Sequence, residues 1–78
     1  MKSSLERFRR AIARSIRDAR RAAGLTQGEL ANRLRRPASH VSRAERGMQG
    51  LSVDEFVDFA RALELDPGEL LSRALEKE

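Results

Sequence analysis

Apolar and polar side chains recur along the chain with the period of an α-helix, in five separate blocks. The first block predicts a long helix that ends near Ala23, with Gly24 as its C-terminal cap. Ser3 and Glu6 are spaced as an N-terminal capping box for this helix. Its apolar stripe has members three or four residues apart: Leu5, Phe8, Ile12, Ile16, Ala19 and Ala23.

Residues 26–47 predict two short helices joined by a tight turn. Thr26 and Glu29 form a capping box for the first, which runs from about Gln27 to Leu34. The second is expected to start at Pro37, because the first helical position needs no N–H donor, and to end at Gly47.

The second of these helices, residues 37–46, has two different sides. Val41, Ala44 and Glu45 share one side and are expected to face inward. The opposite side is small and polar, with two arginines: Ser39, Ser42, Arg43 and Arg46. Arginine can donate a fork of hydrogen bonds to guanine, so this side suits the major groove of DNA, although an ordinary solvated face has the same composition.

The last two blocks predict helices over about residues 53–63 and 67–75. Ser52 and Glu55 are spaced as the capping box of the first, whose apolar stripe is Val53, Phe56, Val57, Ala60 and Leu63. Phe59 falls off the centre of this stripe, so it is expected either to pack against the last helix or to belong to a dimer contact. The last helix has an apolar side of Leu70, Leu71 and Leu75.

Length and composition restrict the class of protein. The 78 residues predict one all-α domain spanning residues 1–78. There is no cysteine, no run of apolar residues long enough to span a membrane, and no apolar core of a secretory signal, so a cytoplasmic location is expected. The chain has three Phe and no Trp or Tyr, which disfavours single-strand binding by base stacking.

Charge is distributed very unevenly along the chain. Residues 1–46 hold 13 basic and 4 acidic side chains, a net charge of +9, whereas residues 47–78 hold 3 and 8, a net charge of −5. Such an asymmetry indicates one surface for a polyanion and another for a different contact. An anionic membrane is one possible polyanion, but the helix-turn-helix pattern favours nucleic acid over a membrane.

Two stretches, TQGELANRL and PASHVSRAERG, resemble the helix-turn-helix of Cro and phage repressors, known as the xenobiotic-response-element (XRE) family. The positions that carry the resemblance are Thr26, Gln27, Leu30, Ala31, Leu34, Ser39, Val41, Ser42, Glu45 and Gly47. The flanking helices fit as well, so the likeness extends over about residues 12–72. It implies a five-helix, lambda-repressor-like domain, here with an extended first helix.

The resemblance also implies roles for individual residues. Arg20 is expected to pair with Glu45, which faces inward and needs a partner for its charge. The turn carries Arg35 where relatives often have glycine, so a left-handed backbone there costs about 1 kcal/mol. Ala44 is smaller than its counterparts, and Phe56 or Phe59 is expected to fill the space. Loop 48–50 lacks the basic residues of many relatives.

Together these observations predict a sequence-specific regulator, expected to be a repressor, that reads double-stranded DNA with helix 37–46 in the major groove as a homodimer. The dimer would form through the long first helix or the acidic C-terminal half. The residues expected to contact bases are Arg43, Ser39, His40 and Ala38, the last of which can only meet a thymine methyl group. Those expected to contact phosphates are Gln27, Arg35, Arg36, Ser42 and Arg46.

Other interpretations remain open at this point. The same scaffold could serve as a protein-binding module, antitoxin- or adaptor-like, with Leu5, Phe8, Phe59 and the acidic helices as its contact. Non-specific duplex or RNA binding by the basic half is a third possibility. No arrangement of nucleophile and base, no phosphate-binding glycine loop and no metal-ligand cluster is evident, so neither an enzyme nor a cofactor or metal site is expected.

Overall fold

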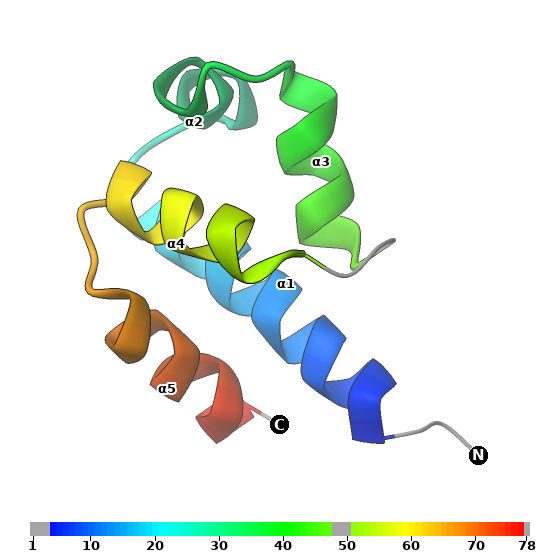
Figure 1. The fold of residues 1–78 in the computed structure, drawn as a ribbon. Helices are drawn as coiled ribbons and strands as arrows, with labels where there is room; N and C mark the ends of the chain where they lie inside the picture. The colour runs from blue at the N-terminus through cyan, green and yellow to red at the C-terminus, as the bar shows by residue number, and fades with distance from the viewer. Residues whose placement is uncertain (1–3, 48–50, 78) are drawn as a thin grey trace.

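The computed structural model describes residues 4–47 and 51–77, and their fold is a bundle of five α-helices (Figure 1). The helices are α1 (Ser4–Ala22), α2 (Gln27–Leu34), α3 (Ala38–Arg46), α4 (Val53–Ala62) and α5 (Pro67–Lys77). The all-α, five-helix prediction is confirmed. The capping role predicted for Ser3 and the prediction for loop 48–50 lie outside the described residues.

The long helix α1 is the axis of the domain. It contacts α5 on one flank and α3 on another, and α4 crosses the bundle in front of it (Figure 1). The core joins all five helices; its largest fully buried apolar side chains are Phe59, Ile16, Leu30, Leu70 and Val41. This arrangement holds α2 and α3 at one end of the domain.

Partners on both flanks of α1 change which of its residues are buried. Ala13 lies against Gly47 at the end of α3, and helical spacing places Ala11 and Ser15 on the opposite flank, where they are also buried. The predicted stripe is right at Ile16 and Ala19 but wrong at its ends. Leu5, near the start of α1, is 54% exposed, and Ala23, which follows the last residue of α1, is also exposed.

The apolar stripes predicted for the last two helices also need correction. Val53, at the first position of α4, is 78% exposed, whereas Phe59 is fully buried, because the core meets α4 through its second half. Full burial removes Phe59 from any dimer contact. In α5 the buried side is made by Leu70 and Ala74, while Leu71 and Leu75 are exposed.

Helix ends account for much of the local structure. Two capping boxes are complete, one between Thr26 and Glu29 and one between Ser52 and Glu55. At both, the side-chain oxygen accepts from the backbone N–H of the glutamate, and the carboxylate accepts from the cap N–H. These hydrogen bonds from backbone N–H groups hold the pKa of Glu29 and of Glu55 below the ordinary value of 4.5.

The two lowered pKa values predict a specific acid sensitivity. A carboxylate with a lower pKa in the folded state takes up a proton on unfolding in acid, so its contribution to stability is complete above about pH 4.5 and is lost as the pH falls through the folded-state pKa. The double variant Glu29→Gln, Glu55→Gln should therefore lose less stability on acidification than the wild type, as measured by urea unfolding from neutral to acid pH. A stability difference between the two proteins that stays constant with pH would contradict this prediction.

Candidate nucleic-acid interface

The turn between α2 and α3 sets the angle of the helix-turn-helix. Arg35 adopts a left-handed conformation, with φ 56° and ψ 43°, and the next backbone N–H, that of Arg36, donates to the carbonyl of Ala31 at 3.0 Å. These are the features of a helix end that normally uses glycine. An L-residue is disfavoured here, so Arg35 is retained at a cost to stability.

Pro37 does not occupy the position predicted for it. It is the N-cap of α3, with φ −63° and ψ 151°, and the helix starts one residue later at Ala38. The extended ψ of Pro37 turns the chain away from the end of α2, and the carbonyl of Pro37 accepts the N–H of His40 at 2.9 Å. The predicted end at Gly47 is confirmed by its φ of 67°.

The two sides of α3 are as different in the structure as in the sequence. Val41 and Ala44 are buried in the core, while the outer side is solvent-accessible. Ser39, Arg43 and Arg46 are exposed there, and Ser42 is half-buried. Ala38 is exposed at the start of the helix. The helix therefore presents a narrow polar side, with small side chains beside long cationic ones.

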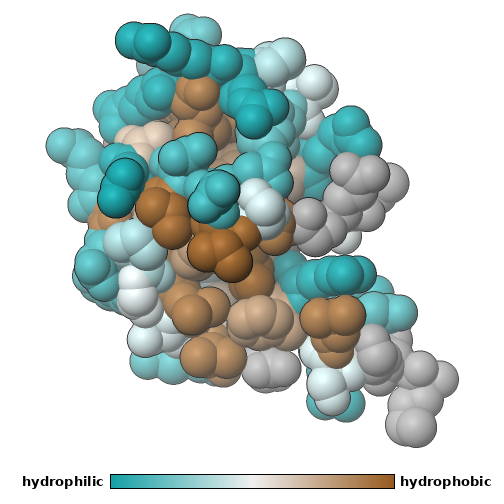
Figure 2. All heavy atoms as spheres, in the orientation of Figure 1, coloured by the Kyte–Doolittle hydropathy of each residue, from teal (hydrophilic) through white to brown (hydrophobic). Residues whose placement is uncertain are grey.

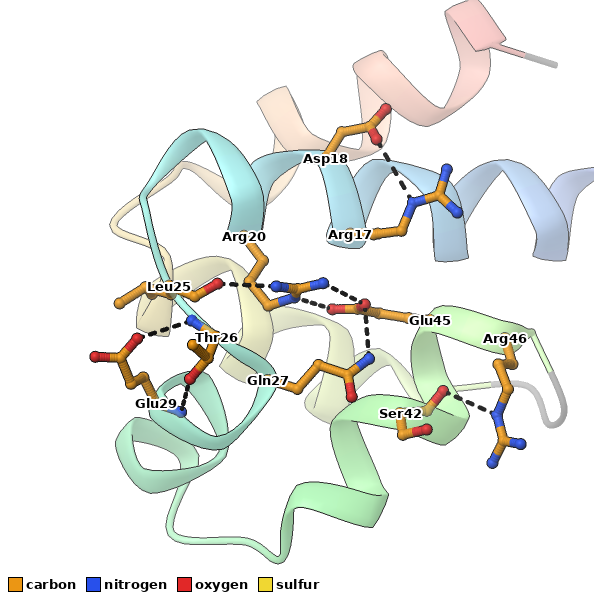
Figure 3. A network of polar contacts seen from close by, with 10 residues as sticks. All are labelled: Arg17, Asp18, Arg20, Leu25, Thr26, Gln27, Glu29, Ser42, Glu45 and Arg46. Carbon is orange, nitrogen blue, oxygen red and sulfur yellow. Dashed lines mark hydrogen bonds and ion pairs between the residues drawn. The ribbon is translucent and has the colours of Figure 1, made fainter.

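The inner edge of α3 is tied to α1 and α2 by a polar network (Figure 3). Arg20 donates from Nε to Oε2 of Glu45 at 2.6 Å and from Nη2 to Oε1 at 3.0 Å, in a bidentate ion pair. Its third donor, Nη1, reaches the carbonyl oxygen of Leu25 at 2.8 Å. The side chains are only 10% and 3% exposed, and the hydrogen bond to Glu45 raises the pKa of Arg20 further.

Gln27 belongs to this network. Its Nε2 donates to Oε1 of Glu45 at 3.1 Å, so the amide predicted to meet a phosphate also braces the inner edge of α3 (Figure 3). An amide nitrogen has two hydrogens, and the second can still donate outward. The network thus connects three helices through the single carboxylate of Glu45.

The remaining predicted cations lie at the two ends of α3. Arg35 and Arg36 are exposed in the turn before it. Arg46 is exposed in its last turn, and its Nε donates to the carbonyl oxygen of Ser42 at 3.4 Å, which leaves its other donors available (Figure 3). Exposed arginines therefore lie both before and after the exposed polar side of α3.

The structure shows a contact of His40 that the sequence did not indicate. Its ring stacks on Phe59 of α4, with ring centroids 5.5 Å apart and planes inclined by 19°. The ring also borders a hollow of about 240 Å³, lined by Arg36, Ser39, Arg43 and Glu55 among others. His40 therefore links the start of α3 to α4 as well as facing the polar side.

One contact that holds α2 in place has no signal in the sequence. Arg33 donates from Nη1 to the carbonyl oxygen of Ala62 at 2.9 Å, across 29 positions of the chain. This carbonyl is at the end of α4, where helical carbonyls lack partners within the helix. The contact fixes α2 against α4 and so supports the angle of the turn.

Within residues 4–47 and 51–77, no group of three or more His, Asp or Glu side chains is arranged to hold a metal ion. None of the described helices is long and apolar enough to cross a membrane.

Comparison with known proteins agrees with this geometry. A family model described as a helix-turn-helix domain matches residues 11–74. Among curated proteins, none matches the chain. An XRE-family like protein from Pseudomonas syringae pv. tomato str. DC3000 is 46% identical, with a TM-score of 0.79 over 90% of this chain and 84% of that one.

Two crystal structures of the clp gene regulator ClgR from Corynebacterium glutamicum are also similar. Their TM-scores are 0.84 and 0.83, each at 28% identity over 88% of this chain, with 90% and 73% of the respective ClgR chains covered. The fold and the arrangement of α2 and α3 define a helix-turn-helix domain. The chain belongs to the XRE-type helix-turn-helix family, whose members are DNA-binding transcriptional regulators.

Proposed function

We propose that this protein binds double-stranded DNA sequence-specifically, with α3 in the major groove, and acts as a transcriptional repressor. The observation that carries the proposal is the difference between the inner and outer sides of α3. One side is fixed to α1 and α2 through Glu45, and the other exposes Ser39 and Arg43. A rigidly held helix with exposed hydrogen-bonding side chains is what base reading requires.

Within this proposal, base contacts centre on Arg43, with Ser39 beside it. The exposed methyl group of Ala38 lies at the end of α3 that enters the groove and suits a thymine methyl group. His40 would support these contacts from its stacked position on Phe59. The phosphate contacts would come from the two sides of the groove: Gln27, Arg35, Arg36, Ser42 and Arg46.

Repression requires only that the bound protein block access to DNA, which a domain of this size can do when it lies in the major groove. A homodimer on a two-fold symmetric site would supply more contact than one copy of α3. Similarity to a clp gene regulator supports a regulatory role in general.

Selection from a pool of random duplex DNA at physiological salt tests the proposal. Enrichment of a defined site is the expected result, and two half-sites about one helical turn apart would indicate a dimer. Salt-sensitive binding without enrichment, together with a stable co-purifying protein, would favour a protein-binding module instead.

The left-handed arginine in the turn allows stability and DNA binding to be separated. Arg35→Gly should raise the free energy of unfolding by about 0.5–1 kcal/mol, since glycine relieves the strain but is more flexible when unfolded. The same variant should weaken DNA binding and reduce the slope of log K against log salt by about 1, because one phosphate contact is lost.

A matched control is available at Glu64, which also has a positive φ, 59°, but lies beyond α4 on the acidic half. Glu64→Gly should stabilise the domain similarly and leave the salt dependence of DNA binding unchanged. If the two variants had equal effects on DNA binding, the assignment of Arg35 as a phosphate contact would be wrong.

A further inference from the structure

An apolar groove opens on a part of the surface away from the polar side of α3. It has a volume of about 420 Å³, and Phe8 and Ile12 of α1, Val53 and Phe56 of α4 and Leu71 of α5 line it. Ala44 of α3 also lines it, so the space beside this small residue is only partly filled. Figure 2 shows the apolar side chains gathered on the face where α4, α1 and α5 meet.

The apolar side of α1 continues past the helices that cover it. Leu5, Ile12 and Ile16 lie on one side by helical spacing, but Ile16 is fully buried while Leu5 is 54% exposed. The family match begins at residue 11, so this uncovered part, the overhang Ser4–Arg10, precedes the shared domain. Leu5 lines the apolar groove and so adds to a contiguous apolar patch, which is the kind of surface that contacts another molecule.

Exposed apolar residues also border the groove on its other two sides. On α4, Val53 lines the groove, and on α5 Leu71 lines it, with Leu75 four residues further along the helix. Val53, Leu71 and Leu75 are all exposed. Because Leu5, Phe8, Val53 and Leu71 line the same groove, the overhang and these two helix edges form one surface, which we name the groove face.

Charge differs between the two edges of the groove face. On the overhang, Arg9 is exposed and lines the groove itself beside Leu5 and Ile12, whereas helical spacing places Arg7 and Arg10 on the other side of α1. On α4, Asp54 and Asp58 are exposed, and Asp54 directly follows the groove-lining Val53. A two-fold axis places one edge of such a face against the other edge of a second copy, so basic meets acidic twice.

We propose that the groove face is a homodimer interface, in which the overhang of each copy packs on the α4 and α5 edges of the other. Leu5 would anchor the contact in the partner's groove, and Arg9 would approach Asp54 of the second copy. The charge complementarity of the face with itself is the reason for choosing a second copy over an unrelated partner. The inference rests on the proposed pairing of two copies on DNA, and it names the surface that makes the pair.

The first test measures self-association of the full chain without DNA. Leu5→Glu should raise the dimer dissociation constant at least about tenfold, as measured by analytical ultracentrifugation over a wide concentration range. Arg14→Glu changes an exposed residue on the opposite side of α1 and should leave the constant unchanged. Circular dichroism checks that both variants keep their helical content.

The second test uses charge exchange, which a general loss of structure cannot imitate. Arg9→Glu and Asp54→Arg should each weaken homodimers, because like charges then meet at both symmetric contacts. A mixture of the two variants should form heterodimers as tightly as wild type, since opposite charges meet at both contacts. The double variant should recover its homodimer for the same reason.

A wild-type chain that stays monomeric at all concentrations would overturn the proposal, as would a dimer insensitive to Leu5→Glu or heterodimers no tighter than the weakened homodimers. Because these measurements contain no DNA, such results would leave base reading by α3 untouched. Failure of the DNA selection would equally leave the dimer interface standing.

Discussion

Replacing Arg20 by alanine is expected to lower the free energy of unfolding by about 3–5 kcal/mol, because it leaves the carboxylate of Glu45 buried without its cation. A domain of this length has a total stability on the order of 4–12 kcal/mol, so the loss is a large part of it. Urea unfolding followed by circular dichroism at neutral pH measures the change.

A second ion pair on the same helix provides the control. Arg17 and Asp18 are 3.8 Å apart with side chains 39% and 44% exposed, so Arg17→Ala should cost less than about 1 kcal/mol. The double variant Arg20→Met, Glu45→Leu should recover most of the lost stability, since no lone charge stays buried. If Arg20→Ala were no more damaging than Arg17→Ala, the network would not be what fixes α3.

Replacing Arg43 by alanine is expected to weaken binding to the selected DNA site by about 1–3 kcal/mol. The arginine is exposed on the outer side of α3 and lies outside the core, so the stability of the free protein should hardly change. Fluorescence anisotropy titration of a labelled duplex, combined with urea unfolding of the variant, separates the two quantities.

Arg61→Ala is the matched control for this variant. Arg61 is an exposed arginine near the end of α4, and its loss changes the net charge by the same amount. Its effect on specific binding should be much smaller than that of Arg43→Ala. Equal losses from the two variants would mean that affinity depends on total charge alone, as expected for a non-specific binder.

Local signals in the sequence were sufficient for the five helices and for most of their ends, although α3 starts one residue later than predicted. The boxes at Thr26 and Ser52 and the left-handed end at Gly47 depend on residues within one turn of each other, so their spacing shows them directly. The inward side of α3 could also be predicted, because a buried Glu45 requires a cation and the family resemblance supplied Arg20.

Features set by the packing of distant helices could not be predicted in this way. Helical spacing alone places Val53 in the apolar stripe of α4 and Phe59 outside it. In the structure α4 meets the core through its second half, so Phe59 is buried and Val53 is exposed. The stacking of His40 on Phe59 and the hydrogen bond from Arg33 to Ala62 join residues 19 and 29 positions apart. Only the three-dimensional arrangement brings such residues together.

The fold also shows where the basic and acidic parts of the chain lie on the domain. In the proposed complex the exposed arginines of the turn and of α3 would face DNA, whereas Asp54 and Asp58 on α4 are exposed on the acidic half of the chain. The acidic half would be repelled by phosphates, which favours one orientation of the domain on the duplex. In the proposed complex, charge would therefore help to direct α3 toward the groove.

The measurement that tests base reading by α3 most directly is a comparison of specificity between wild type and Arg43→Ala. Both proteins would be titrated against the selected site and against every single-base-pair variant of it. Loss of discrimination by Arg43→Ala at one base pair of each half-site, with the other preferences retained, is the predicted result. A specificity profile identical to that of wild type would contradict the assignment of α3 as the reading helix through Arg43.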